Sequence, residues 1–133
     1  MTNEERKNQV YAIVFEVSVT NEDIDDIVTT AFEGGINYWC SYADADWDHV
    51  RKEDIDCYAS ELISRGYTLR LHDAEEDKDY ELTRDKVING IHYTLKNGYL
   101  KCVPGSKIDM NEVDAIVSDV IIQAGLFGDV IYG

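Results

Sequence analysis

The most regular pattern of apolar and polar positions lies in residues 20–40. Four apolar side chains follow the i, i+3, i+4, i+7 spacing of one helix face, and acidic side chains occupy the opposite face. The pattern predicts an amphipathic helix over residues 21–33, with Thr20 and Asp23 as its cap and a double glycine at its end. The apolar stripe consists of Ile24, Ile27, Val28 and Ala31.

Alternation of apolar and polar residues predicts β-strands in four other segments. Residues 9–19 alternate with one fully apolar face, and residues 36–42 alternate after the double glycine. Residues 67–73 and 79–83 alternate on either side of a polar loop, which predicts a β-hairpin with a charged tip. Residues 1–8 are polar and are expected to fray.

Three further helices are predicted by helical periodicity, over about residues 54–64, 84–96 and 109–124. In the last of these, Ala115 and Ile122 lie almost opposite the main apolar stripe. This helix is therefore expected to be covered on two sides, either by the fold or by another subunit. The apolar residues that follow it are expected to dock on the body of the protein.

These elements predict an α+β fold in which residues 1–133 form a single domain. A small antiparallel or mixed β-sheet is expected to pack against about four helices. A chain of 133 residues can bury a core without disulfides or metal ions. With 44% hydrophobic residues and nine tyrosines, the chain is also too apolar to be a disordered acidic tail.

Charge narrows the classes of partner. The chain has 27 acidic and 12 basic residues, which gives a formal net charge of -15. Direct binding to nucleic acid is disfavoured, because it depends on lysine and arginine displacing counterions from the phosphates. A basic protein partner is electrostatically favoured. In acidic proteins generally, however, such charge more often serves solubility alone.

The remaining composition favours a cytoplasmic protein. The three cysteines are odd in number and far apart, as expected for reduced thiols rather than a disulfide framework. No apolar run approaches the roughly 20 residues that a membrane-spanning helix needs, and the N-terminus is polar where a signal peptide would be apolar. We therefore expect no membrane association.

An aspartate triplet, Asp44, Asp46 and Asp48, resembles the start of a helix-loop-helix calcium loop. The resemblance then stops, because His49 stands where that loop needs glycine and Ile55 where it needs a bidentate glutamate. Closely spaced Cys and His pairs for zinc are also absent from the sequence. We expect a solvated acidic loop, and no metal or cofactor.

Cysteine chemistry offers one catalytic hypothesis. Cys40 with His49 or His92 would supply a nucleophile and a base only if the fold brought them together. A cysteine between aromatic residues is more often a packed apolar side chain. We therefore expect a protein that is not an enzyme, with an enzyme using Cys40 as the less favoured hypothesis.

The acidic residues occur in bursts at a predicted helix start, in a connector and at the predicted hairpin tip. All three places reach solvent. If the bursts share one side of the molecule, their carboxylates would resemble the phosphates of a nucleic acid and could occupy a basic channel. The predicted partner contacts are Asp23, Asp26, Asp44, Asp46, Asp48, Glu75, Glu76 and Asp77.

Three segments together resemble a known protein family. They are DIDDIVTTAFEGGINYWC from Asp23, YASELISRGYTLRLHDAE from Tyr58 with YELT after it, and VDAIVSDVIIQAGLFGDVIYG from Val113. They are similar to a family of small acidic proteins carried by phages, prophages and related mobile elements of Firmicutes and Bacteroides. This family includes anti-CRISPR proteins that act against type II-A systems.

The resemblance implies a non-enzymatic inhibitor whose partner is a basic nucleic-acid-binding protein, the RNA-guided nuclease of a type II-A CRISPR system. Such an inhibitor would block either DNA binding or DNA cleavage. The alternative is a structural or assembly protein of a mobile element that oligomerises through its C-terminal helix and tail. The interface residues of that alternative are Ala115, Ile122, Phe127 and Ile131.

Overall fold

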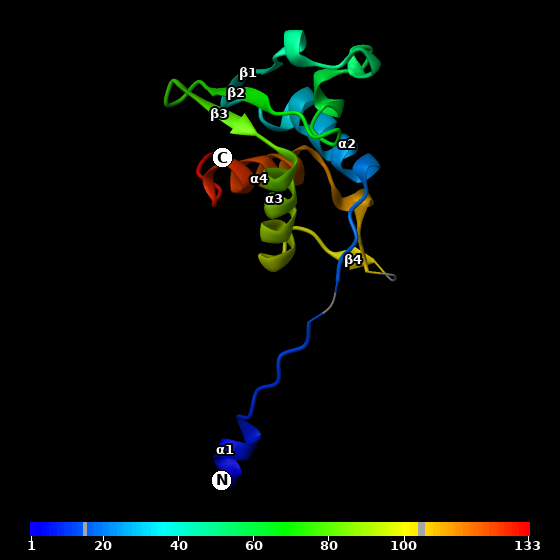
Figure 1. Ribbon diagram of the computed structural model, residues 1–133. Helices are drawn as coiled ribbons and strands as arrows, with labels where there is room; N and C mark the ends of the chain where they lie inside the picture. Colours follow the sequence, from blue (N-terminus) through cyan, green and yellow to red (C-terminus); the bar gives the residue numbers. More distant parts are fainter. Residues whose placement is uncertain (15, 104–105) are drawn as a thin grey trace.

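An α+β fold is formed by the residues that the computed structural model describes, 1–14, 16–103 and 106–133 (Figure 1). The helices are α1 (Asn3–Lys7), α2 (Asn21–Thr30), α3 (Arg84–Lys96) and α4 (Ala115–Phe127). The strands β1 (Cys40–Ala45), β2 (Leu69–Asp73) and β3 (Lys78–Leu82) form an antiparallel sheet in the order β1-β2-β3. A separate short hairpin consists of β4 (Cys102–Val103) and β5 (Lys107–Ile108).

The predicted first helix is confirmed, and its cap is the predicted one. Thr20 Oγ1 accepts a hydrogen bond from the Asp23 amide, and Asp23 Oδ2 accepts one from the Thr20 amide, both at 3.1 Å. The helix continues as one π-helical turn, η1 (Ala31–Gly35). Thr83 caps α3 through the Lys86 amide, so that helix also begins where the sequence predicts.

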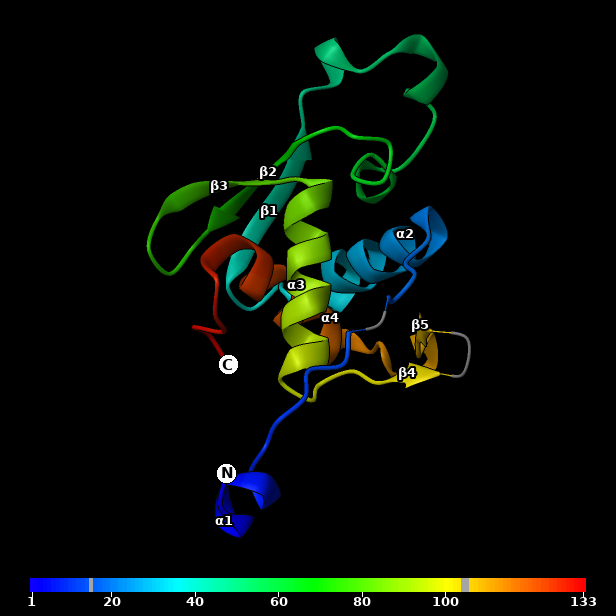
Figure 2. The ribbon, with the colours of Figure 1, turned by 60° about the horizontal axis from the view of Figure 1, so that its bottom comes forward.

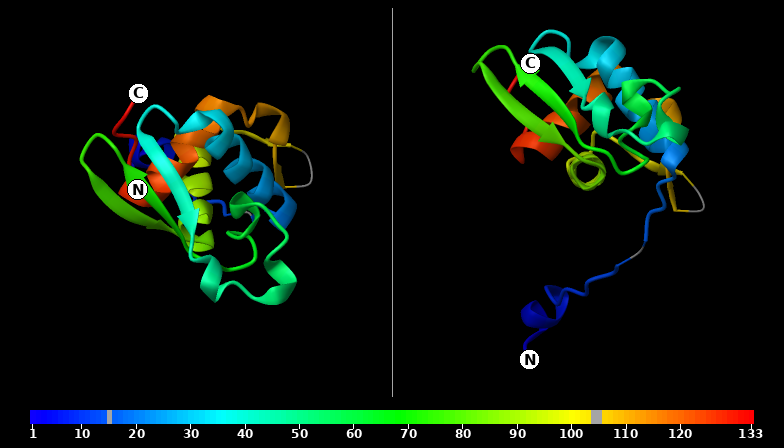
Figure 3. Two further views of the ribbon diagram at one scale, coloured as in Figure 1. Left: turned by 90° about the horizontal axis from the view of Figure 1, so that it is seen from above. Right: turned by 45° about the horizontal axis from the view of Figure 1, so that its top comes forward.

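The predicted hairpin is confirmed as β2 and β3, and its inner face supplies part of the core. Leu69, Leu71 and Leu82 are fully buried. Strand β1 begins at Cys40 rather than at residue 36, because the amides of Trp39 and Cys40 both donate to the carbonyl oxygen of Ile36 and form a turn. The sheet lies on one side of the helices (Figure 3).

Helix α4 is the centre of the core. All eight residues from Val117 to Ala124 are buried, because α2, η1, α3 and β3 surround the helix. The prediction that two sides of this helix are covered is confirmed, and the cover is the chain's own fold. Ile122 is fully buried within the protomer, so its predicted role as a contact with a second copy is wrong.

Helices α3 and α4 cross with their backbones in direct contact. A Cβ atom on Gly90 of α3 would overlap the carbonyl oxygen of Ile121, and one on Gly125 of α4 would overlap the carbonyl oxygen of Lys86. Only glycine fits at either crossing point without separating the helices. The view in Figure 2 shows α3 lying across α4.

The C-terminal tail docks on the body, as predicted, through one buried glutamine. Gln123 Oε1 accepts hydrogen bonds from the amides of Ile131 at 2.9 Å and Tyr132 at 2.8 Å. Gln123 Nε2 donates to Asp119 Oδ1 at 2.8 Å and to the Tyr132 carbonyl oxygen at 3.2 Å. The indole of Trp39 also donates to Asp119 and stacks on the ring of Tyr132. The tail is therefore a fixed part of the fold.

The predicted strand over residues 9–19 is wrong. Residues 9–14 form neither helix nor strand, and only Ser18 makes a bridge, with its amide donating to the carbonyl oxygen of Ser106 at 2.7 Å. Alternation makes a segment suitable for a strand, but a strand also needs a neighbour for its backbone hydrogen bonds. At the start of the chain, α1 is a single exposed turn where fraying was expected.

The predicted helix over residues 54–64 is also wrong, because side chains rather than helical hydrogen bonds organise this connector. Arg65 Nη1 and the Tyr67 hydroxyl each donate to the Asp54 carboxylate at 2.7 Å, and Arg51 donates to it at 3.3 Å. These hydrogen bonds, that of Tyr67 first, hold the pKa of Asp54 below its ordinary value. Short 3₁₀ turns replace the helix: η2 (Trp47–His49), η3 (Lys52–Asp54) and η4 (Ala59–Glu61).

The last predicted helix begins later than expected. Asp109 starts only the 3₁₀ turn η5 (Met110–Glu112), and α4 is capped by Asp114, whose carboxylate accepts from the Val117 amide at 2.8 Å. The helix then extends to Phe127 and ends at Gly128, which has the left-handed φ of 78°.

The substitution Gly90→Ala tests the helix crossing. It is expected to lower the free energy of unfolding by about 3 kcal/mol, because the added methyl group forces α3 and α4 apart. Gly34→Ala is the matched control, since a Cβ atom at Gly34 meets nothing within 4 Å. Urea unfolding followed by circular dichroism measures both variants. Equal stability of the two would contradict the direct backbone contact.

The substitution Gln123→Ala tests the docking of the tail. It leaves the amides of Ile131 and Tyr132 without their acceptor and is expected to lower the free energy of unfolding by about 2 kcal/mol. The tail should also be cleaved faster by carboxypeptidase. Gln9→Ala, at an exposed position in the N-terminal segment, is the control and should change neither quantity. A tail that is digested at the wild-type rate in Gln123→Ala would argue that apolar packing alone holds it.

Candidate acidic binding site

The outer face of the sheet carries two rows of polar side chains that cross all three strands. In one row, Tyr42 of β1 pairs with His72 of β2, which pairs with Asp79 of β3. In the next row, Asp44 pairs with Arg70, which pairs with Glu81. Burial alternates along β2, with Leu69, Leu71 and Asp73 buried and with Arg70 and His72 on the outer face, as expected for a strand whose sequence alternates.

The first row is held together by hydrogen bonds and stacking. The rings of Tyr42 and His72 stack with centroids 5.1 Å apart and planes 9° apart. His72 Nδ1 lies 2.6 Å from Asp79, and Nε2 lies 3.0 Å from Asp77 at the hairpin tip. The hydrogen bond with Asp79 and the nearby carboxylates raise the pKa of His72, although partial burial opposes them.

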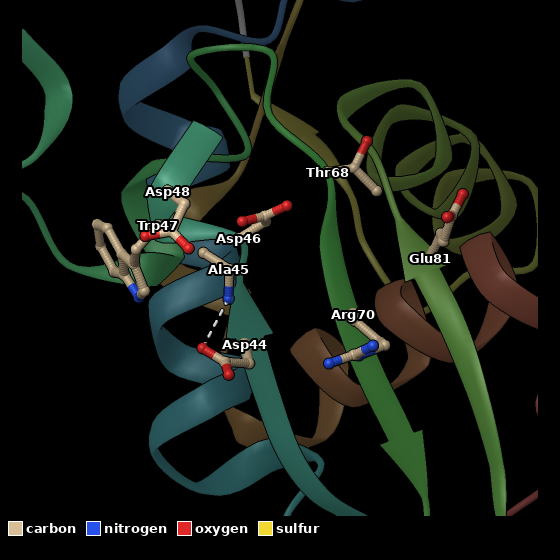
Figure 4. A pocket seen from close by; sticks show the side chains of 8 residues that line it. All are labelled: Asp44, Ala45, Asp46, Trp47, Asp48, Thr68, Arg70 and Glu81. Carbon is tan, nitrogen blue, oxygen red and sulfur yellow. Dashed lines mark hydrogen bonds between the residues drawn. The ribbon is translucent and has the colours of Figure 1, made fainter. Parts of the chain in front are cut away.

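The second row forms one wall of a pocket of about 500 Å³ at the end of β1 (Figure 4). Strand β1 ends at Ala45, where Asp44 Oδ1 accepts a hydrogen bond from the Ala45 amide at 2.8 Å. Asp46 and the first two residues of the turn η2 follow β1 and also line the pocket. The lining residues are Asp44, Ala45, Asp46, Trp47, Asp48, Thr68, Arg70 and Glu81.

The pocket is acidic and has one aromatic side chain. Four carboxylates line it against one guanidinium, that of Arg70, whose ion pair is a long one with Asp79 at 3.9 Å. Among the ion pairs of the described residues, none includes Asp44, Asp48 or Glu81. Trp47 is 37% exposed. Carboxylates beside an exposed indole suit a lysine or arginine side chain, through ion pairing and cation–π attraction.

The structure brings together three of the eight predicted contact residues, because Asp44, Asp46 and Asp48 all line this pocket. Its other chemical groups were missed by the sequence reasoning. Glu81 and Arg70 join the site only through the register of the hairpin, which the alternation pattern does not specify. Trp47 was not among the predicted contact residues.

The hairpin-tip acids Glu75, Glu76 and Asp77 lie at the opposite end of the sheet. Asp73 at the tip pairs with Cys40 at the start of β1, whereas the pocket lies beyond Ala45 at the end of β1. The amides of Glu75 and Glu76 both donate to the buried Asp73 carboxylate, which fixes the turn. The tip and the pocket are therefore separate acidic regions.

The acids of α2 form a third region. Asp23 is occupied as the helix cap, with its carboxylate bonded to the Thr20 amide, and Asp26 is exposed on the helix. The eight predicted residues therefore occupy three regions, on α2, in the connector and at the hairpin tip (Figure 3). The eight carboxylates therefore do not form one continuous surface. Three of them, Asp44, Asp46 and Asp48, line the pocket.

Cys40 is poorly suited to nucleophilic catalysis. The thiol is buried and donates to the carbonyl oxygen of Tyr42 at 3.2 Å. Burial raises the pKa of Cys40 to about 11, so the reactive thiolate is scarce at neutral pH. His49, one of the two bases considered, instead contacts Asp46 at 2.6 Å.

The remaining residues of the predicted oligomer interface differ in their surroundings. Ala115 is exposed at the start of α4, and Ile131 is about half exposed in the tail. Phe127 is partly buried and makes edge contacts with the rings of Trp39 and Tyr80. Together with the buried Ile122, this leaves no continuous apolar patch formed by the four residues.

Comparison of the chain with protein-family models, curated proteins and solved structures finds no match. Within the described residues, no three His, Cys, Asp or Glu side chains are grouped to hold a metal ion. No helix formed by those residues is both long and apolar enough to cross a membrane.

The pH dependence of stability tests the His72 contacts. Because the folded pKa is raised, the stabilisation is complete below the unfolded pKa of about 6.5 and is lost as the pH rises through the folded pKa. The variant His72→Gln should lose this part of the pH dependence. Urea unfolding from about pH 6 to pH 8 measures it, with His92→Gln, exposed on α3, as control. Identical profiles for wild type and His72→Gln would contradict the assignment.

Proposed function

We propose that this protein is a non-enzymatic inhibitor that binds the RNA-guided nuclease of a type II-A CRISPR system. The contact is an acidic surface centred on the pocket between the end of β1 and the outer face of the sheet. Binding there blocks either DNA binding or DNA cleavage by the nuclease. The observation that carries the proposal is that four carboxylates and Trp47 line one pocket of a chain with a net charge of -15.

The nature of the target supports this choice. An RNA-guided nuclease holds the guide and its DNA target in positively charged channels, and it reads the protospacer-adjacent motif with arginine side chains. Those arginines and lysines are the groups that an acidic protein attracts. The resemblance of three segments of the chain to the family that includes type II-A anti-CRISPR proteins supports the same target.

The geometry of the pocket supports a specific mode of contact. A lysine or arginine of the nuclease would enter between Asp44, Asp48 and Glu81, none of which belongs to an ion pair among the described residues. Trp47 lies beside Asp48 at the rim of the pocket, with its indole pointing away from Arg70 and Glu81 (Figure 4). An inhibitor that engages such an arginine competes with DNA for it. No covalent bond is made or broken.

Two variants, each lacking three negative charges, distinguish the effect of the pocket on binding from the effect of net charge. The pocket variant carries Asp44→Asn, Asp46→Asn and Asp48→Asn, and the matched control carries Glu75→Gln, Glu76→Gln and Asp77→Asn. Each removes three negative charges while keeping side-chain size. The pocket variant is expected to bind purified nuclease with guide RNA at least 10-fold more weakly, which corresponds to about 1.4 kcal/mol. Its affinity should also depend less on salt.

The control variant is expected to bind within about threefold of wild type, since the tip lies at the other end of the sheet. Isothermal titration calorimetry at two salt concentrations measures both variants. Equal weakening of the two would show that net charge, and not the pocket, determines binding. Unchanged affinity in both would reduce the acidic surface to a solubility role.

A further inference from the structure

The dipeptide Asn-Gly occurs twice in the chain, as Asn89-Gly90 inside α3 and as Asn97-Gly98 at its end. This dipeptide is especially prone to lose ammonia without an enzyme, because glycine has no side chain to hinder the attack of its amide nitrogen on the asparagine side chain. The product is aspartate or isoaspartate. Because the two dipeptides share the same chemistry, their surroundings in the fold decide whether each one reacts.

Asn89-Gly90 lies where the fold opposes the reaction. Helical geometry commits the backbone amide of Gly90 to the carbonyl oxygen four residues earlier in α3. Gly90 is also buried, with its backbone against that of Ile121 in α4. Turning the Gly90 amide toward the Asn89 side chain would therefore break both the helix and its crossing with α4.

Asn97-Gly98 has different surroundings at the C-terminal end of α3. Both residues are exposed, and Gly98 has a left-handed φ of 80°, with nothing within 4 Å of where a Cβ atom would lie. Among the backbone hydrogen bonds of the described residues, none is donated by the Gly98 amide. This nitrogen therefore lies outside the hydrogen-bond ladder of the helix. Figure 1 shows this end of α3 pointing away from the three-stranded sheet.

A hydrogen bond to the last turn holds the Asn97 side chain. Asn97 Nδ2 donates to the carbonyl oxygen of Tyr93 at 2.8 Å, and the Asn97 amide donates to the same oxygen at 2.9 Å. The side chain must leave this oxygen before its Cγ atom can meet the Gly98 nitrogen. The end of a helix opens at a much lower free energy than its interior, so this step needs only local fraying.

We propose that Asn97 is a site of spontaneous deamidation and that Asn89 is not. The Gly98 nitrogen loses its proton to hydroxide and attacks Cγ of Asn97, which forms a carbon–nitrogen bond and closes a succinimide ring. The side-chain nitrogen takes up a proton from water and leaves as ammonia. Water then adds to either carbonyl carbon of the ring and breaks its bond to nitrogen, which gives aspartate or isoaspartate at position 97.

The modification removes the C-terminal cap of α3. A carboxylate at position 97 cannot donate to the Tyr93 carbonyl oxygen, and it places negative charge at the negative end of the helix dipole. In isoaspartate the main chain gains one carbon atom, which displaces the amides of Tyr99 and Leu100 from the carbonyl oxygen of Thr94. The end of α3 then loosens. The site is separate from the acidic pocket, so the proposal is independent of the proposed function.

Peptide mapping of the folded protein after incubation in mildly alkaline buffer tests the proposal. Asn97 is expected to form aspartate and isoaspartate at least about 10-fold faster than Asn89, which corresponds to a difference of about 1.4 kcal/mol in the free energy of local opening. In guanidinium chloride, where the helix is unfolded, the two rates are expected to lie within about threefold of each other. Asn89 is therefore an internal control with the same dipeptide.

Substitutions test the effect on the cap. Asn97→Asp carries the charge of the product and is expected to lower the Tm by about 4 °C. Asn89→Asp adds the same charge at an exposed position within α3 and is expected to lower the Tm by less than half as much. Asn97→Gln keeps an amide but closes the larger ring far more slowly, so no isoaspartate is expected at position 97.

Other results would overturn the proposal. If Asn97 stays intact in the folded protein but reacts in guanidinium chloride, the cap protects it. Equal rates at Asn97 and Asn89 in the folded protein would mean that the reaction passes through global unfolding. Aspartate without isoaspartate would indicate direct hydrolysis and no succinimide. Equal Tm values for the two aspartate variants would contradict the loss of the cap.

Discussion

The direct contact between the backbones of α3 and α4 is the constraint on which the rest of the structure depends. With glycine at Gly90 and Gly125, the two helices approach until the backbone of each touches the other. Helix α4 therefore packs directly against α3, and the other sides of α4 contact α2, η1 and β3. A wider crossing would open the core and would move the sheet, together with its outer face, away from the helices.

A network of buried polar groups holds the C-terminal tail in place. Asp119 is buried beside Tyr38, Trp39 and Gln123, and all three donate hydrogen bonds to it. Partial burial, followed by the hydrogen bond to Asp119, raises the pKa of Tyr38 to about 12. Through Gln123 the same network holds the tail, and the tail's Tyr132 hydroxyl donates to Asp73 at the hairpin tip at 2.6 Å. The hairpin that carries the outer face is thereby tied to α4.

The elements that the sequence predicted correctly are those whose signals are local. The cap of α2 lies within four residues, and the hairpin alternates over two short segments, so each can be read without knowing its neighbours. The α+β class follows from these elements. The crossing at Gly90 could not be predicted, because an isolated glycine within a helix does not reveal which backbone lies against it.

The predictions that were wrong depended on contacts between segments, which a local pattern does not reveal. Residues 9–14 alternate like a strand, yet the described residues offer them no neighbouring strand, so the pattern alone does not form one. Residues 54–64 contain helix-compatible spacing, but Asp54 gathers Arg65 and Tyr67 from elsewhere in the chain and fixes a connector instead. At the candidate site, the aspartates were visible as a sequence pattern, whereas Glu81 reached them only through strand register.

In the proposed function, the helical core supports the sheet, and the acidic pocket on the outer face of the sheet binds the nuclease. The most direct test of this function is a DNA-cleavage assay with a purified type II-A nuclease, its guide RNA and increasing amounts of the wild-type protein. The account predicts that cleavage falls as the protein is added and that DNA added in excess before the protein reduces the effect if DNA binding is the step blocked. Undiminished cleavage at a large molar excess, across nucleases from several hosts, would contradict it.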